Sequence, residues 1–157
     1  MQSDPKSPTI NPVLIKWFHS KLINTTDDDT VTLDEKPIDS LQIVGRVILF
    51  SIETSKVFIK LEDGTGILDF VVNKRIDEDV PRILKNIDLN SKSSYLRVVF
   101  SPQVYKGKIN NVVSKIDVVK DFNLITYHFL NVLYAMKYRN DGISANIRYE
   151  KYLKIAL

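Results

Sequence analysis

Apolar and polar residues alternate along five segments of the chain, at residues 41–53, 56–62, 67–72, 94–105 and 109–119. Alternation with a period of two is typical of strands that bury one face. Residues 77–89 and 121–140 instead space their apolar residues three and four apart, which predicts helices. The predicted order is three strands, a short helix that closes one end of the sheet, two strands and a final helix.

This order predicts an all-β fold with flanking helices, a five-stranded OB-fold barrel whose first helix lies between strands 3 and 4. The first strand should place one face inward, at residues 41, 43, 45, 47 and 49. Gly45, in the middle of that strand, predicts a bulge or a sharp bend there. Pro102 interrupts the fourth strand, which predicts a bulge or an edge position.

The second and third predicted strands are joined by Asp63-Gly64-Thr65-Gly66. Asp-Gly favours a tight hairpin because glycine adopts positive φ at little cost. The stretch does not match the G-x-x-x-x-G-K-[ST] pattern of a phosphate-binding loop. Barrel architecture is therefore the favoured role of this hairpin.

The regions outside the predicted barrel strands differ from them in composition. Residues 1–12 are polar and proline-rich and predict a flexible tail. Residues 13–120 form the predicted barrel domain, with an apolar N-terminal strap and an acidic loop at 24–40. The final helix at 121–140 precedes a linker or short tail at 141–157.

The final helix carries a stripe of apolar residues, and Asp121 is a candidate N-cap. Another helix is already predicted to close the barrel, so this stripe has to be buried against something else. Either it packs on partner chains, or it folds back on the outside of its own barrel. The predicted partner-binding residues are Ile125, Phe129, Val132, Leu133 and Met136.

The net charge of +3 is unevenly distributed. Residues 24–40 contain six acidic residues and one basic residue, whereas residues 92–115 contain five basic residues and no acidic one. The basic stretch either attracts a polyanion or is a solvated strand pair.

The composition argues against several kinds of chemistry. With no cysteine and two histidines, the chain offers no thiolate ligand set, and we expect no metal, no cofactor and no enzymatic activity. His128, beside the apolar stripe, is expected to be a packed or capping residue. No apolar run approaches the roughly 20 residues of a membrane span, and the N-terminus has no signal-peptide core. We therefore expect a cytosolic or nuclear protein without membrane contact.

Several stretches together resemble the middle subunit of replication protein A, the eukaryotic heterotrimer that binds single-stranded DNA. They are "NPVLIK", "LQIVGRVILF", "IKLEDGTGILDFVV", "SYLRVVFSPQVYKGKINNVVSKI" and "DFNLITYHFLNVLYA", spread over roughly residues 10–138. The last stretch, directly after the fifth strand, is the most specific. The resemblance implies a nuclear protein of replication, repair, recombination or telomere maintenance. It also implies that the final helix joins a large and a small subunit in a three-helix bundle.

The resemblance further implies weak contacts between the barrel and single-stranded DNA. The family's aromatic residue at the end of the fourth strand matches Tyr105. The alternative for Tyr105 is a structural role, as an aromatic residue at the hairpin edge that covers its neighbours. The family's tryptophan after the third strand aligns with Asn73, so that stacking platform is missing. The candidate DNA-binding residues are Tyr105, Lys106, Lys108, Phe58, Lys60, Lys74, Arg75 and Arg46.

Two alternatives stay open from the sequence. The stretch "KPIDSLQIVGRV" also resembles the middle subunit of the telomere-capping complex, or a telomerase-associated complex, of the same family. In the other alternative the barrel is a scaffold that binds only protein.

Overall fold

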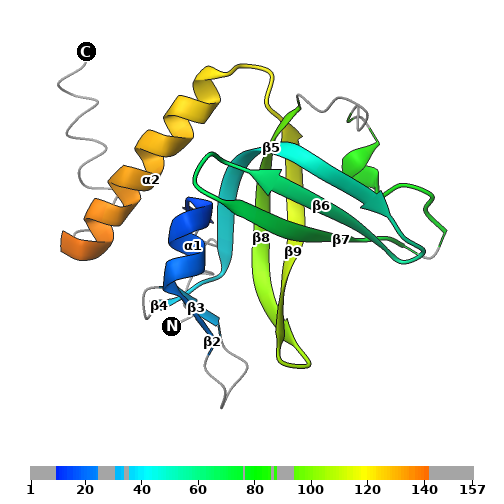
Figure 1. Ribbon diagram of the computed structural model, residues 1–157, viewed down its shortest axis with the longest axis horizontal. Helices are drawn as coiled ribbons and strands as arrows, with labels where there is room; N and C mark the ends of the chain where they lie inside the picture. Colours follow the sequence, from blue (N-terminus) through cyan, green and yellow to red (C-terminus); the bar gives the residue numbers. More distant parts are fainter. Residues whose placement is uncertain are drawn as a thin grey trace, which may run out of the picture.

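The computed structural model describes residues 10–24, 31–33, 36–75, 77–85, 87 and 94–141. The barrel strands are β5 (Ser40–Ile52), β6 (Lys56–Glu62), β7 (Ile67–Asn73), β8 (Tyr95–Tyr105) and β9 (Lys108–Val118). They pair in the order β5-β6-β7-β9-β8, and β8 returns to pair with β5, which closes the barrel (Figure 1). The predicted OB fold is therefore confirmed.

The closure is uneven around the barrel. β8 and β9 pair along most of their length, whereas β7 and β9 are joined in parallel at one position, Val71 opposite Val112. The β8–β9 hairpin consequently extends beyond the barrel (Figure 1). Its turn has positive φ at both Lys106 (50°) and Gly107 (73°), as a two-residue hairpin turn requires.

The N-terminal part of the chain wraps onto the barrel. β1 (Ile10–Pro12) pairs in parallel with the start of β5, so residues 10–12 belong to the sheet and not to the predicted tail. Residues 1–9 lie outside the described residues. The helix α1 (Ile15–Lys21) then places Ile15 and Phe18 in the barrel core. The Phe18 ring packs edge-on against Phe100, with 5.7 Å between ring centroids.

The acidic stretch predicted as a loop contains short strands. β2 (Leu22–Asn24), β3 (Val31–Leu33) and β4 (Lys36–Pro37) form a small antiparallel sheet beside the barrel. Within the described residues of 77–89, where a helix was predicted, the structure has a 3-10 turn, η1 (Arg82–Leu84), whose Leu84 is buried. The barrel core is covered both by this turn, through Leu84, and by α1, through Ile15 and Phe18, and the sequence did not single out α1 for this role.

A bulge in β5 changes which residues face inward. The register with β6 shifts between Val47 and Leu49, so alternation reverses and Leu49 is 48% exposed instead of inward. Gly45 is not the bulge. A Cβ there would lie 2.9 Å from the carbonyl oxygen of Glu62, so glycine allows β5 and β6 to approach closely. Pro102 does lie on an edge, because β8 pairs with β5 only as far as Phe100.

The final helix, α2 (Asn123–Asp141), lies outside the barrel on the same side as α1 (Figure 1). Asp121 caps it as predicted, its Oδ1 accepting a hydrogen bond from the backbone N–H of Asn123 at 2.9 Å. The helix contacts β1 and β5 of its own chain. Residues 142–157, predicted as a linker or tail, lie outside the described residues.

Candidate nucleic-acid interface

A groove of about 620 Å³ crosses the outer face of β6 and β7 and is bounded by β9. Phe58 and Lys60 of β6 line it, as the sequence predicted for an outward face. Ile67 and Asp69 of β7 lie opposite, and β9 contributes a wall at residues 109–111. Because this wall continues into the β8–β9 turn, groove and hairpin tip form one continuous surface.

The groove is apolar and close to neutral in charge. Leu49 and Ile67, each about half exposed, line it together with Phe58. The Nζ atom of Lys60 lies 3.4 Å from a carboxylate oxygen of Asp69, so this lysine's charge is largely balanced. Such a surface favours flat apolar groups over isolated phosphates.

The predicted residues at the hairpin tip lie together. The Tyr105 ring is 64% exposed, which leaves room for a base to stack on it. The Nζ atom of Lys106 lies 5.3 Å from the ring centroid, in a cation–π arrangement. Lys108 pairs with Tyr105 across the turn. Within the described part of the chain, neither lysine has a carboxylate partner.

The other predicted cations do not line the groove. Arg46 donates to a carboxylate oxygen of Glu62 at 2.8 Å, and this hydrogen bond raises the pKa of Arg46. Lys74 donates to the backbone carbonyl of Glu53 at 3.4 Å, at the turn between β5 and β6. Arg75 is exposed beside it. The candidate DNA-binding residues therefore lie in three places. Tyr105, Lys106 and Lys108 are at the hairpin tip, Phe58 and Lys60 are in the groove, and Lys74 and Arg75 are at the turn between β5 and β6. Arg46 lies apart from all three.

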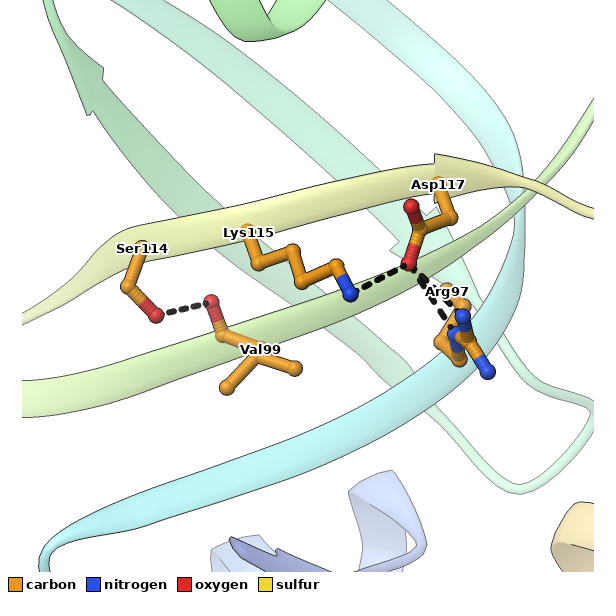
Figure 2. A network of polar contacts seen from close by, with 5 residues as sticks. All are labelled: Arg97, Val99, Ser114, Lys115 and Asp117. Carbon is orange, nitrogen blue, oxygen red and sulfur yellow. Dashed lines mark hydrogen bonds and ion pairs between the residues drawn. The ribbon is translucent and has the colours of Figure 1, made fainter. Parts of the chain in front are cut away.

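Part of the basic stretch at residues 92–115 is balanced internally. Figure 2 shows Arg97 of β8 and Lys115 of β9 converging on one carboxylate oxygen of Asp117. The Nη2 atom of Arg97 lies 2.8 Å from that oxygen, and the Nζ atom of Lys115 lies 3.6 Å from it. The surplus of positive charge seen in the sequence is thus smaller on this face. Among the described residues of this stretch, the basic residues without an ion pair are Lys106 and Lys108.

Sequence reasoning missed two side chains that cover the edge of β7. The backbone carbonyl of Ile67 lies 3.0 Å from the Nε2 atom of His19, on α1. The carbonyl of Asp69 accepts a hydrogen bond from the Nδ2 atom of Asn111, on β9, at 2.9 Å. Both residues line the groove. Their sequence neighbourhoods carry no signal for this role, because it arises from long-range packing, of α1 on β7 for His19 and of β9 beside β7 for Asn111.

The apolar stripe predicted on α2 is divided between the barrel and the solvent. Val132 is fully buried within this chain, so its prediction as a partner-binding residue is wrong for this conformation. Ile125, Phe129 and Met136 are partly buried at the boundary. Leu133 is 60% exposed, as is Leu130, which the stripe did not include. The exposed apolar face is rotated from the predicted one because the barrel covers the side that carries Val132.

His128 attaches α2 to the N-terminal strap. It is buried, as predicted for a packed residue, and its Nε2–H donates to the backbone carbonyl of Val13 at 3.1 Å. Its Nδ1 atom is buried without a hydrogen-bond partner among the described residues. Burial lowers the pKa of His128, against smaller opposing effects of the Val13 hydrogen bond and the charge of Asp63.

Two other classes of site are not found in the described ranges. No group of three or more histidine, cysteine, aspartate or glutamate side chains there is arranged to hold a metal ion. Of the helices described, none is long and apolar enough to cross a membrane.

Comparison with known proteins gives a consistent picture. No protein-family model matches the chain. It is 25% identical over 130 residues to a 32 kDa subunit of replication protein A from Arabidopsis thaliana, covering 83% of this chain and 45% of that protein. The chain therefore spans about half the length of this curated relative.

Two solved structures share the fold. A chain of a replication protein A heterotrimer bound to single-stranded DNA superimposes with a TM-score of 0.66 and 22% identity, covering 82% of this chain and 95% of that one. A chain of the S. pombe Stn1–Ten1 complex superimposes with a TM-score of 0.67 and 17% identity, covering 90% and 97%. In sequence and fold, the chain resembles the middle subunit of replication protein A, and it shares its fold with the Stn1–Ten1 complex.

Proposed function

We propose that this chain is a non-enzymatic, nuclear subunit of a heterotrimeric complex that binds single-stranded DNA, similar to replication protein A. The observation that carries the proposal is the groove on β6 and β7, which continues into the exposed Tyr105 at the hairpin tip. Bases stack on aromatic rings while lysines meet the phosphates, and this surface offers both kinds of group. The complex would act in replication, repair, recombination or telomere maintenance.

The contribution of this subunit to DNA affinity is weak. Asn73 stands where the family has a stacking tryptophan, and a lost stacking platform lowers affinity by about 1–3 kcal/mol per base. Lys60, the predicted cation that lines the groove, is also engaged with Asp69, and Arg46, outside the groove, is engaged with Glu62. We infer that Lys106 and Lys108 make the main phosphate contacts.

Assembly with the large and small subunits uses the exposed face of α2. Leu130 and Leu133 are both 60% exposed on a helix whose other side is already covered by the barrel. Burying each fully would stabilise an interface by roughly 1.5–3 kcal/mol. Partly buried Phe129 and Met136 border this face, which fits packing in a three-helix bundle.

The test is a salt titration of oligonucleotide binding by the assembled complex. Affinity for single strands falls with a log–log slope of about −0.7 per phosphate contact. Replacing both Lys106 and Lys108 by glutamine should make the slope less negative by about 1.4. Lys115→Gln is the matched control, because Lys115 already pairs with Asp117. An unchanged slope in the double variant would remove the hairpin tip from the interface.

A second candidate function has specific support. The likeness to a chain of the Stn1–Ten1 complex favours a middle subunit of a telomere-capping complex, with the same groove and helix. The neutral groove, in turn, favours a scaffold that binds only protein. Identification of the large partner in a pull-down separates a subunit of a replication protein A-like complex from a subunit of a telomere-capping complex. Absence of any salt-sensitive DNA binding by the complex would favour the protein-binding scaffold.

A further inference from the structure

Asn111 occupies an unusual position at the floor of the groove. It is 7% exposed, and its Nδ2–H donates to the backbone carbonyl of Asp69 at 2.9 Å. This bond fixes the orientation of the amide, because the flipped amide would place its oxygen against the carbonyl oxygen. The other end of the amide is therefore the carbonyl oxygen Oδ1.

That oxygen is buried without a hydrogen-bond partner among the described residues. A buried acceptor without a donor costs free energy, and such groups call for an explanation in a folded protein. A ligand that brings a donor to this point would recover that cost. Among ligand groups, an N–H is the natural match for an amide oxygen.

The amide oxygen is closed off from solvent, so a ligand reaches it only where the seam between β7 and β9 widens. β7 and β9 are paired at one position, Val71 with Val112, directly beside Asn111. Widening this seam therefore breaks few backbone hydrogen bonds. The groove around the seam is lined by Phe58, Leu49 and Ile109, which suit the flat apolar face of a base.

We propose that this groove is a base-binding pocket in which Asn111 Oδ1 accepts a hydrogen bond from the exocyclic amino group of cytosine or adenine. Thymine carries a carbonyl oxygen at the corresponding position, which would face Oδ1 with a second acceptor. The subunit would then favour cytosine and adenine over thymine. This inference rests on the proposed binding of single-stranded DNA and adds a base preference to it.

The test compares two oligonucleotides of about 12 residues on the assembled complex. One is oligo-deoxycytidine, and the other carries 2-pyrimidinone, which is cytosine without its amino group. The wild-type complex should prefer cytosine by roughly fivefold, the size of one ordinary net hydrogen bond. Asn111→Leu should abolish the preference, while Asn123→Leu, exposed at the start of α2 and outside the groove, should keep it.

The outcomes are distinguishable. Equal affinities of the wild-type complex for the two oligonucleotides would overturn this inference and leave the proposed function intact. Absence of binding to either would overturn both. Because the wild-type comparison changes only the ligand, equal affinities overturn the inference even if Asn111→Leu does not fold. If a folded Asn111→Leu variant keeps the preference for cytosine, another residue is responsible for that preference and the inference is wrong.

Discussion

The Oδ2 atom of Asp63, in the hairpin between β6 and β7, accepts a hydrogen bond from the backbone N–H of Ile15 at 2.8 Å. Its Oδ1 atom accepts from the backbone N–H groups of Thr65 and Gly66, and from the Thr65 hydroxyl at 2.7 Å. The Thr65 hydroxyl oxygen in turn accepts from the N–H of Lys16. The glycine-bearing hairpin is therefore a cap for α1, and it holds the helix that places Ile15 and Phe18 in the barrel core.

We expect Asp63→Ala to lower the free energy of unfolding by about 2–3 kcal/mol. The carboxylate is buried and accepts several hydrogen bonds, and bonds to charged groups contribute about 1.5–3 kcal/mol each. Chemical denaturation with the wild type alongside measures the change. Asp77→Ala, at an exposed acidic position, should have little effect. A loss no larger than that of Asp77→Ala would show that the cap is unimportant.

The burial of His128 predicts that stability falls on acidification. Its folded-state pKa lies below the ordinary value of about 6.5, so below that pH the unfolded chain binds more protons than the folded one. The stabilising contribution is full above about pH 6.5 and is lost as the pH falls toward the folded-state pKa. His128→Gln should remove this part of the pH dependence. Urea midpoints measured across that range for both proteins test it, and identical pH profiles would contradict it.

Loss of the Tyr105 ring should weaken DNA binding without affecting the fold. The ring is mostly exposed, and stacking with a base is worth about 1–3 kcal/mol, so Tyr105→Ala should weaken affinity by roughly tenfold. Tyr105→Phe should retain the affinity, because it keeps the stacking face. Fluorescence anisotropy with a labelled oligonucleotide on the assembled complex measures both. Equal weakening by the two variants would argue against stacking.

The barrel itself could be predicted from the sequence because alternation marks each strand independently. Tyr105 was identified by the family resemblance, and Lys106 and Lys108 as its basic neighbours; the structure places all three at the turn between β8 and β9. Leu49 was assigned to the wrong face because a bulge depends on the register with a neighbouring strand, which alternation in one strand does not reveal.

Long-range contacts account for the other differences. The hydrogen bond from Asn111 to Asp69 joins strands distant in sequence, and the cap that Asp63 provides for α1 joins residues 48 positions apart. The orientation of α2 depends on the bond between His128 and Val13, which buries Val132 and leaves Leu130 exposed. Helical periodicity gave an apolar stripe but could not say which part of it the chain's own barrel covers.

The most direct measurement is the assembly of the complex with the exposed face of α2 altered. The chain, co-expressed with the large and small subunits, should elute with both as one species. Replacing both Leu130 and Leu133 by alanine should release the chain from that species, while Lys137→Ala, exposed on the same helix, should not. Survival of the full complex with the double variant, at wild-type yield and stability, would contradict the account.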